Sequence, residues 1–464
     1  MKLTAHILRA IVILSIVCGY GIAGGVNATV LSPYESRFGY LGNPYGISGV
    51  EDMSQSWTAA FLSGLYFQPF DDVGFRWDRP HPGPFNRNLI EQTPGVYDFS
   101  IPDAYVRQAQ RRGIQIIATI WPYVQWDQAQ WADNPQCKKT SGWTADLPVS
   151  RCKPYDTQAY MAFVRALVGR YCCDGGNSMP GLLYPIKHWE ILNEPESALT
   201  QSSPMIFFTG SPFDYLQLMD ATAAAVRQAD PSAAITNGGT VGNNLSYWRE
   251  ILLAAGARYF TLGSHHYFPS NSTSGDLGSA DWINLLNEFG IRGSWLTEYR
   301  ELSEDHPDIG ITASETGQAI RIVKGYTRSF AAGTGRIFYV YYRMKDGGLI
   351  QPQGNRRRPA YYALKQLMAK VDGFTDVTTA APNDNASVFA YKFMVNATPV
   401  YVLWAAAVTR VELPLSSAIV RGVTVTGALP LDDIGTMPVY SMLTSSGTVV
   451  IDITPIPVYV EEFQ

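Results

Sequence analysis

Two glutamates stand at the ends of apolar, β-prone runs, and this pattern is the feature of the sequence best suited to chemistry. Glu194 follows the run from Trp189 to Leu192, and Glu298 follows Trp295 to Thr297. Two carboxyl groups that face each other across a cleft can cleave a glycosidic bond, one as general acid and the other as nucleophile or base. The sequence therefore predicts hydrolytic chemistry on sugars if the fold brings the two glutamates together.

The residues around Glu194 favour a defined position at the end of a strand. Pro195 prevents the strand from continuing and restricts the backbone of the residue before it. Asn193 offers a side-chain amide to a substrate hydroxyl, whereas Glu190 lies inside the run, where we expect a structural role. The alternative for Glu194 is a solvated surface turn.

Other candidate site residues also follow β-prone runs. The hydroxyl of Tyr267 is suited to hold an ionised carboxylate, and the positive charge of Arg79 would do the same for Glu298. His265 offers a ring to sugar hydroxyls or to the acid. Aromatic rings stack on the apolar faces of sugars, and we expect such supporting roles for Trp121, Trp295 and Tyr341.

The adjacent His265 and His266 raise the question of a metal. No carboxylate or cysteine follows them at the spacing of a metal site. Two carboxyl groups and water suffice for glycoside hydrolysis. We therefore expect neither a metal nor a cofactor.

Between residues 40 and 370, short β-prone runs alternate with amphipathic helices, a pattern typical of parallel βαβ units. The best helix is predicted over 156–171, with apolar side chains spaced three and four residues apart on one face. With a first strand placed near 46–50, the strands number eight, which predicts a (β/α)8 TIM barrel. The other seven strands are expected at Val73 to Trp77, Ile114 to Ile120, Ile186 to Leu192, Ala233 to Thr236, Phe260 to Tyr267, Ser294 to Thr297 and Arg336 to Tyr342.

This barrel would place both glutamates at one rim. Glu194 ends the fourth strand and Glu298 the seventh, so they approach from opposite sides of the mouth. A separation of about 5–5.5 Å would indicate retention of configuration, and about 6.5–9.5 Å inversion. The long connection from Trp121 to Tyr155 also follows a strand, which places its tryptophans Trp126, Trp131 and Trp143 at the active-site face.

The pattern changes near residue 371, where helical periodicity gives way to short alternating strands. We expect an antiparallel β-sandwich over 371–464, serving as a structural cap rather than as a separate sugar-binding module. The catalytic barrel would then occupy 29–370.

Residues 1–28 have the character of a signal peptide. Lys2 and Arg9 precede an apolar run from Ala10 to Val17, and small residues near Ala28 suit cleavage. We expect export to the periplasm, the cell surface or the medium. Four cysteines remain after cleavage, which allow three pairings. Cys137 with Cys152 is the simplest pair, and free or vicinal thiols are the alternative.

Composition narrows the class of partner. Hydrophobic residues make up 46% of the 464-residue chain and charged residues 16%, so a large core is expected. The net charge is −5 and the only basic run is 356–358, which argues against nucleic acid because phosphate binding needs clustered cations. No membrane span is expected once the signal is removed. The expected partner is a carbohydrate substrate.

With these residues in place, the chain resembles the retaining glycoside hydrolases of clan A, and particularly members of glycoside hydrolase family 39. Asn193-Glu194-Pro195 matches the strand-four motif, and the resemblance implies that Glu194 is the acid/base. Thr297-Glu298 matches the strand-seven nucleophile. Supporting matches are Arg79 in Trp77-Asp78-Arg79 on strand two, His265-His266-Tyr267-Phe268-Pro269 on strand six, and the segment from Pro94 to Phe99 with Asp103.

The chain departs from this pattern at Leu192, where many relatives carry tryptophan, and at Glu196, where many carry asparagine. The resemblance implies an exported retaining hydrolase of β-linked polysaccharides or oligosaccharides. An exo-acting β-xylosidase-like or β-glucosidase-like enzyme is the alternative within this class. Outside it, the alternative is a non-catalytic carbohydrate-binding barrel.

Overall fold

The computed structural model describes residue 32 and residues 34–463, apart from 51–54, 136, 138–145, 174, 201–205, 242–243, 255–257, 270–274, 381–386, 417–420 and 445–446. The predicted signal peptide at 1–28 and Trp143 lie outside the described residues.

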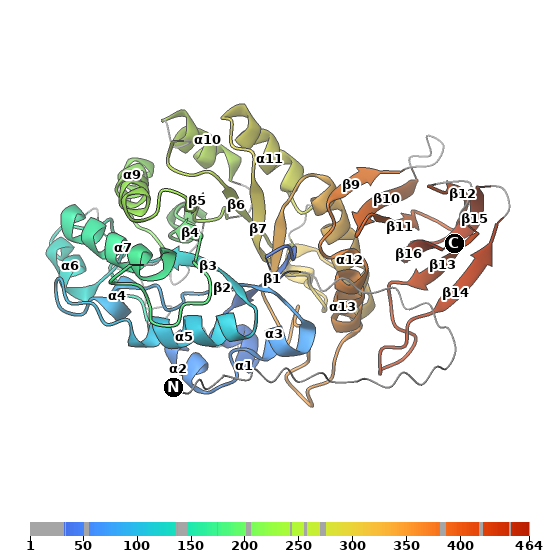
Figure 1. Ribbon diagram of the computed structural model, residues 1–464, viewed down its shortest axis with the longest axis horizontal. Coiled ribbons are helices and arrows are strands. Elements are labelled where there is room, and N and C mark those ends of the chain that lie inside the picture. The colour runs from blue at the N-terminus through green and yellow to red at the C-terminus, as the bar shows by residue number, and fades with distance from the viewer. Residues whose placement is uncertain are drawn as a thin grey trace, which may run out of the picture. The chain divides into compact units, whose positions relative to one another are not determined.

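Eight parallel strands form the barrel that the alternating pattern predicts (Figure 1). They are hydrogen-bonded in the order β5-β4-β3-β2-β1-β8-β7-β6. A bridge between Thr236 and Leu262 joins β5 to β6, and the Asn237 side chain both donates to and accepts from the backbone of Ser264. The TIM-barrel prediction is thus confirmed. The strands are β1 Phe38–Gly42, β2 Trp77–Pro80, β3 Gln115–Ile120, β4 His188–Ile191, β5 Ala234–Asn237, β6 Gly263–Tyr267, β7 Ser294–Tyr299 and β8 Arg336–Tyr339.

The first strand lies earlier than predicted. It covers Phe38–Gly42, whereas the predicted region near 46–50 falls largely in the short helix α1, Pro44–Ser48. The side chain of Asn43 accepts from the Gly46 N–H and starts that helix, with Pro44 at its first turn. The cap and the proline outweigh the β-prone residues that follow them.

Helices surround the strands, as Figure 1 shows. The predicted 156–171 helix is confirmed as α7, Thr157–Cys172. The apolar side chains predicted on one face are all buried, and they are Tyr160, Phe163, Val164, Leu167, Val168 and Tyr171. Asp156 caps it by accepting from the Ala159 N–H. The other helices are α2 Trp57–Leu62, α3 Gln68–Val73, α4 Arg87–Ile90, α5 Ser100–Arg111, α6 Gln125–Gln128, α8 Ser197–Thr200, α9 Pro212–Ala229, α10 Leu245–Leu253, α11 Ser279–Glu288, α12 Glu315–Ala331 and α13 Pro359–Val371.

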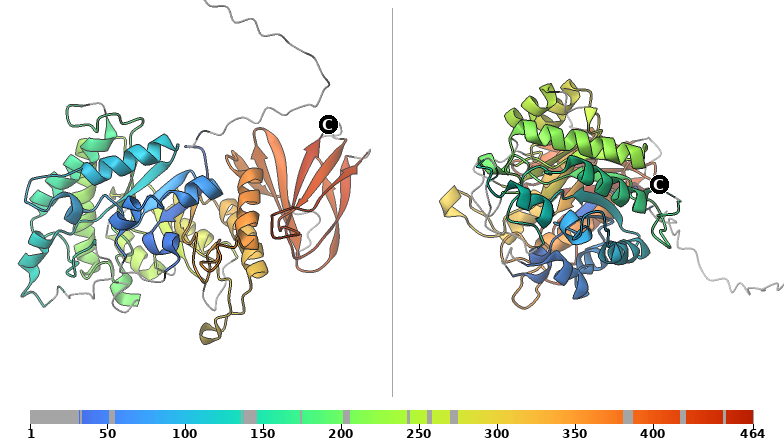
Figure 2. Two further views of the ribbon diagram at one scale, coloured as in Figure 1. Left: turned by 90° about the horizontal axis from the view of Figure 1, so that it is seen from below. Right: turned by 90° about the vertical axis from the view of Figure 1, so that its left-hand side faces the viewer.

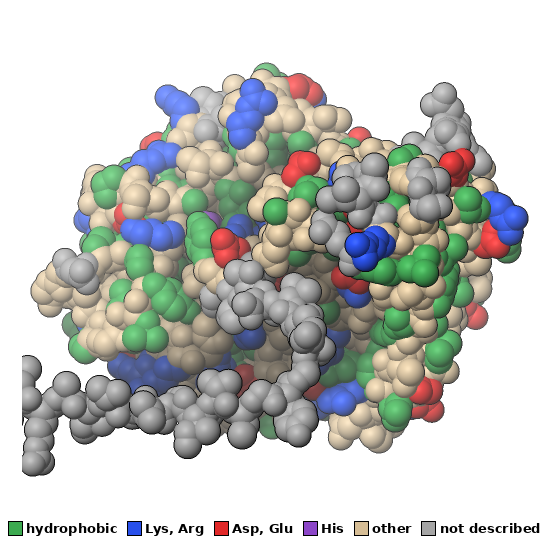
Figure 3. Space-filling view, turned by 45° about the vertical axis from the view of Figure 1, so that its right-hand side comes forward, with side chains coloured by type: hydrophobic (Ala, Val, Ile, Leu, Met, Phe, Trp, Pro, Cys, Tyr) green, Lys and Arg blue, Asp and Glu red, His purple; other side chains and the backbone are tan. Residues whose placement is uncertain are grey.

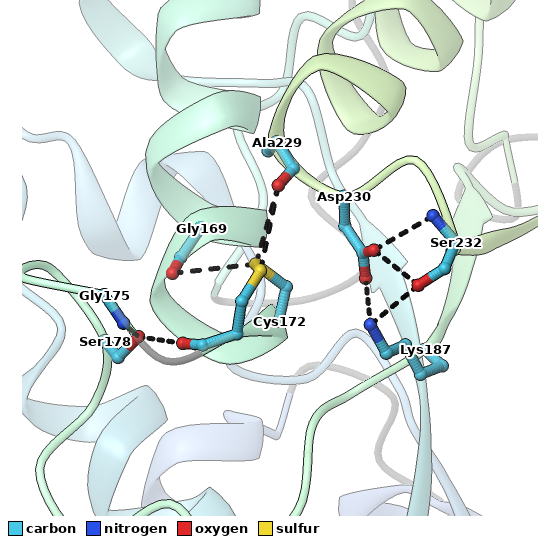
Figure 4. Close-up of a disulfide and its surroundings, with 9 residues drawn as sticks. Gly169, Cys172, Gly175, Ser178, Lys187, Ala229, Asp230 and Ser232 are labelled. Atoms are coloured by element: carbon cyan, nitrogen blue, oxygen red, sulfur yellow. Dashed lines mark hydrogen bonds and ion pairs between the residues drawn. A yellow bond between two sulfur atoms is a disulfide. The ribbon is translucent and has the colours of Figure 1, made fainter.

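Two disulfides use the four cysteines. Cys137 pairs with Cys152, as predicted, and closes a loop within the long connection after β3. Cys172 pairs with its neighbour Cys173 at the end of α7, and both sulfurs contact the carbonyl of Ala229 at the end of α9 (Figure 4). The second pair therefore lies within the end of α7 and against the end of α9.

After α13, the chain forms antiparallel sheets. A six-stranded sheet has the order β14-β13-β16-β11-β10-β9, and β12 pairs with β15. One face of the larger sheet packs with β12 and β15 around an aliphatic core, which confirms the predicted sandwich. The strands are β9 Asp376–Thr379, β10 Val388–Val395, β11 Thr398–Ala405, β12 Thr409–Pro414, β13 Gly422–Gly427, β14 Val439–Leu443, β15 Thr448–Ile453 and β16 Val458–Phe463.

The opposite face of the six-stranded sheet packs on the barrel helices α12 and α13 (Figure 2). The guanidinium of Arg328 lies 4.4 Å from the ring centre of Phe389, and Phe374 contacts both Phe330 and Phe393 at 5.1 Å. Both faces of β10 and β11 are therefore used for packing, which accounts for the long buried stretch of β11. These contacts favour the structural role expected for this region.

Charged side chains on the surface are mixed. Figure 3 shows basic groups scattered among acidic and apolar ones on the face it presents. In the part of the chain that is described, none of the helices combines the length and apolar character needed to cross a bilayer.

Candidate active site

The end of β4 follows an uncommon backbone path that carries Glu194 into the barrel mouth. Leu192 and Glu194 both adopt left-handed conformations, with φ of 67° and 40°. Such conformations cost about 1–3 kcal/mol in non-glycine residues and persist where neighbours enforce them, often at functional sites. Here the Leu192 N–H donates to the carbonyl of Ile120, and the Glu194 N–H donates to that of Gly238. The turn expected at Pro195 is thus held by both neighbouring strands.

Two glycines after β5 make room for this turn. A Cβ atom on Gly238 would lie 2.8 Å from the carbonyl oxygen of Ile191, and one on Gly239 would lie 2.1 Å from Nε2 of His266. Only glycine permits so close an approach of β5 to β4 and to the His266 ring.

An irregularity in β7 places the second carboxylate. The register with β6 shifts between His265 and His266, so that His265 pairs with Leu296 and His266 with Glu298. A regular strand would send Thr297 and Glu298 to opposite faces. With the shift, Thr297 contacts Ser264 and His266, while Glu298 contacts Arg79. The bulge therefore aims both side chains into the mouth, a common use of bulges beside active sites.

Arg79 donates hydrogen bonds to three side chains at the barrel mouth. Its Nε donates to Glu190 at 2.7 Å, one terminal nitrogen to Glu298 at 2.6 Å and the other to Asn193 at 2.5 Å. The guanidinium is fully buried. Burial alone would lower the pKa of Arg79, but the charges of Glu190 and Glu298 raise it above its ordinary value. A permanent cation thus lies directly against Glu298.

Glu190 has the structural environment expected from its place inside the strand. Besides Arg79, it accepts hydrogen bonds from Thr119 at 2.6 Å and Ser264 at 3.3 Å. Its side chain is fully buried. Glu190 therefore orients Arg79 from below and has no access to solvent.

The environment of Glu194 favours its protonated form. Burial raises the pKa of Glu194 to about 8, an effect that the Arg79 charge opposes and the Glu190 charge reinforces. Nδ1 of His266 lies 2.7 Å from Oε1 of Glu194. Burial, together with the Arg79 charge, lowers the pKa of His266 to about 3. The contact therefore joins a neutral carboxylic acid to a neutral ring.

Glu298 differs from Glu194 in its contact with a fixed cation. The pKa of Glu298 is raised above its ordinary value, and burial is the largest cause. The charges of His266 and Arg79 oppose this rise, and the charge of Glu194 adds to it. The ion pair to Arg79 favours the ionised form of Glu298. The two carboxyl groups thus differ in their surroundings, because Glu194 bonds a neutral ring whereas Glu298 pairs with a fixed cation.

The two carboxyl groups are close together. One oxygen of Glu194, one oxygen of Glu298 and a ring nitrogen of His266 lie within 4.8 Å of one another. The same three donors would suit a divalent cation. However, the guanidinium of Arg79 already neutralises Glu298, and His266 already bonds Glu194. Both carboxyl groups thus already have a partner among the side chains of the site.

A third carboxyl group lies behind the pair. Glu196 is fully buried, and its Oε1 accepts from the Val241 N–H and the Trp248 indole. Its Oε2 has no hydrogen-bond partner among the described residues. Burial raises the pKa of Glu196 to about 8, and the Glu194 charge adds to the shift. The sequence showed Glu196 only as a departure from the family pattern.

Two tyrosines lie beside the pair. The rings of Tyr45 and Tyr341 are 6.0 Å apart and nearly perpendicular. Burial raises the pKa of Tyr45, followed in order by the charges of Tyr341 and Glu298, and Glu194 also contributes. Tyr45 was missed in the sequence because the first strand was placed too late to show that it follows β1.

Of the other predicted residues, Trp121 and Tyr267 lie at the ends of β3 and β6. Trp121 is fully buried, and its indole donates to the carbonyl of Pro82 at 2.6 Å. The Tyr267 ring is 9% exposed and lies 6.4 Å from that of Tyr299. Both residues therefore lie at the rim that carries the carboxyl groups.

The structure does not bring His265 or Trp295 to the carboxyl pair, which corrects both predictions. His265 points out of the barrel, where its ring contacts Ser279 of α11 and the carbonyl of Trp295. Because side chains alternate along a strand, His266 rather than His265 faces inward. Trp295 lies near the start of β7 and packs on Trp77 and Phe338, at the opposite end of the barrel.

Comparison with known proteins shows the fold. Neither the models of protein families nor the curated proteins give a match to this sequence. Among solved structures, a family 39 glycoside hydrolase from the gut symbiont Bacteroides cellulosilyticus aligns with a TM-score of 0.61 and 14% identity, covering 93% of this chain and 82% of that one.

Two further structures are comparably similar. A GH30 endoxylanase from Clostridium papyrosolvens aligns with a TM-score of 0.60 and 14% identity, over 92% of this chain and 96% of its own. A monomeric β-xylosidase from Caulobacter crescentus aligns with a TM-score of 0.60 and 15% identity, over the same shares. The chain thus has the fold of the family 39 and family 30 glycoside hydrolases, a barrel with an appended β-domain.

Proposed function

We propose that the protein is an exported retaining β-glycosidase that cleaves a polysaccharide or oligosaccharide by double displacement. The observation that carries the proposal is that one carboxyl oxygen of Glu194 and one of Glu298 lie within 4.8 Å of each other. Burial favours the protonated form of Glu194, and Glu298 is ion-paired with Arg79. This separation supports retention, because inversion needs about 6.5–9.5 Å to admit a water molecule.

In the first step, the ionised Glu298 attacks the anomeric carbon, and Glu194 transfers its proton to the oxygen of the leaving group. The bond to the leaving group breaks as the bond to Glu298 forms. Consumption of the Glu298 charge removes a negative charge close to Glu194, which favours the ionised form of Glu194 that the second step requires.

In the second step, Glu194 takes a proton from water as that water attacks the anomeric carbon and releases Glu298. His266 Nδ1 keeps the Glu194 side chain in place, and Arg79 stabilises the departing carboxylate. The enzyme then returns to its starting protonation state.

The substrate proposal draws on the structural neighbours. These neighbours include an endoxylanase, β-xylosidases and a glucosidase, so β-linked xylose or glucose polymers are the first substrates to try. Export is supported by the signal-like sequence at 1–28 and by two disulfides, which persist in oxidising compartments.

The decisive experiment compares wild type with Glu298→Ala on a panel of aryl β-glycosides, with and without azide. We expect loss of turnover in the variant, rescue by azide and an α-glycosyl azide product, because azide replaces the missing nucleophile on the opposite face. The matched control is Glu288→Ala, which removes a half-exposed carboxylate at the end of α11 that is paired with Arg249 of α10. Undiminished turnover by Glu298→Ala would overturn the mechanism.

Two rival functions make different predictions. A metal hydrolase that uses the histidines would lose activity in EDTA, whereas the proposed mechanism predicts no change. A non-catalytic binding barrel would show no turnover of any β-glycoside, although it would retain polysaccharide.

A further inference from the structure

We propose that a groove between α7 and α9 is a second carbohydrate-binding site, suited to a neutral stretch of a β-linked polysaccharide. The proposal rests on the proposed function for the class of ligand, and on the groove itself for the existence of a site.

The groove is large enough for sugar rings. Its volume is about 510 Å³, within the range of about 300–1,000 Å³ typical of small-molecule sites. Side chains of α7 and α9 form its walls, and the Tyr160 hydroxyl meets that of Thr222 at 2.7 Å between the two helices. None of its lining residues belongs to the carboxylate site, so the two are separate.

Two aromatic rings stand at one end of the groove. Trp131 and Tyr155 meet edge to face, with ring centres 5.3 Å apart. Tyr155 is 56% exposed. A ring exposed to this extent remains accessible to a ligand, and such rings stack on the apolar faces of pyranoses.

The segment that carries these rings is held in place from within. The carboxylate of Asp127 accepts from the backbone N–H groups of Tyr155 and Asp156. Gln128 exchanges two hydrogen bonds with the backbone of Cys152, which the disulfide to Cys137 also anchors. The rings are thus preorganised, which lowers the entropic cost of binding.

The polar lining favours a neutral sugar. Gln158, Gln217 and Asp220 are exposed and offer amide and carboxylate groups to hydroxyls. The ammonium of Lys153 is paired with Asp214 at 2.7 Å and bonds Gln217. No uncompensated cation among these groups remains to select a uronic acid, so hydroxyl recognition is the remaining chemistry.

The position of the groove links it to the reaction. It starts at the first turn of α7 and lies along α9, beside the long connection that leaves β3 at Trp121 (Figure 1). The N-terminal ends of barrel helices lie at the same face as the active site. A polymer held in the groove would therefore stay near the mouth that cleaves it.

Affinity electrophoresis in gels containing beechwood xylan or hydroxyethylcellulose tests this proposal without requiring turnover. Chains carrying Glu298→Ala would be compared with and without Trp131→Ala and Tyr155→Ala. We expect the two groove substitutions to weaken polysaccharide retardation by at least about tenfold while turnover of aryl glycosides by the Glu298-intact variant stays within about twofold, because the groove is separate from the carboxyl pair.

Two further variants separate loss of the site from loss of folding. Ala224→Arg fills the groove from α9 without altering either ring and should give the same loss. Phe213→Ala removes a 65% exposed ring at the start of α9 that does not line the groove, and should change nothing. Equal retardation of parent and groove variants, or no retardation in either gel, would overturn the proposal. Failure of the glycosidase assay alone would count against the proposed function and not against the groove.

Discussion

The two ends of the barrel strands differ in chemistry, although the same strands supply both. β2 carries Trp77 at its start and Arg79 two residues later, and β7 carries Trp295 near its start and Glu298 near its end. At the closed end, aromatic rings pack on one another, and the guanidinium of Arg336 lies 4.2 Å and 4.5 Å from two of them. At the mouth, three buried glutamates surround one arginine and one histidine.

This difference separates stability from function. The buried tryptophan and phenylalanine rings at the closed end contribute favourable packing and carry no ionisable group. Buried carboxyl groups with raised pKa values and left-handed residues before a proline reduce stability, and they occur where chemistry requires them. The rule that barrel function lies at the carboxyl ends of the strands and stability at the other end has a concrete basis here.

The largest expected effect is at the mouth. Glu194→Gln removes the proton donor but preserves shape, so we expect kcat on substrates with poor leaving groups to fall by about 10²–10⁴-fold. In the parent, activity should fall as pH rises through about 8, where the acid ionises, and the variant should lack this limb. pH–rate profiles on aryl and alkyl β-glycosides measure both. A parent-like profile in the variant would refute the acid role.

At the closed end, Trp295→Ala should act on stability. Loss of a buried tryptophan costs about 3–5 kcal/mol of unfolding free energy, while kcat of the folded enzyme should stay close to that of the parent. Denaturant unfolding and kcat at a temperature well below the Tm measure these quantities. Tyr440→Ala, at a half-exposed position of β14, is the control and should change little. A loss of kcat without a loss of stability would break the comparison.

The adjacent histidines His265 and His266 sharpen this comparison between functional and stabilising side chains. His266→Asn should lower kcat on the order of 10²-fold, because the acid loses the ring that positions it. His265→Asn should lower only stability, by about 1–3 kcal/mol, because its ring bonds Ser279 outside the barrel. Equal kcat losses in the two variants would show that the inward and outward faces are not distinct.

The last expected effect concerns Glu196 and is confined to the pH dependence of stability. Its folded pKa of about 8 lies above the ordinary carboxyl value of about 4.3, so the folded state binds more protons between these pH values. Stability therefore falls as pH rises through this window. Glu196→Gln cannot ionise and should gain Tm relative to the parent at pH 8 compared with pH 5. Glu288→Gln, at an exposed site, is the control, and parallel Tm curves would contradict the prediction.

Much of the barrel could be predicted because its signals are local. Alternating strands and amphipathic helices identify each unit from neighbouring residues, and the 156–171 helix was placed to within one residue of each end. The first strand was missed because a cap at Asn43 and Pro44 decides the local structure against β propensity. The sandwich was also visible, although the packing of both faces of β10 and β11 depends on partners far along the chain.

The sequence by itself determined that Glu194 and Glu298 end the fourth and seventh barrel strands. The apolar runs and Pro195 are adjacent to these glutamates, and the order of the strands follows from the order of the runs along the chain. Only the tertiary structure decided that His266 and not His265 faces the pair, that Arg79 holds Glu190, Asn193 and Glu298 together, and that Glu196 is buried behind them. The bulge in β7 and the glycines after β5 decide which way the side chains point, because a small change of register sends a side chain to the opposite face. Burial in the folded protein then decides the charge states of the carboxyl groups.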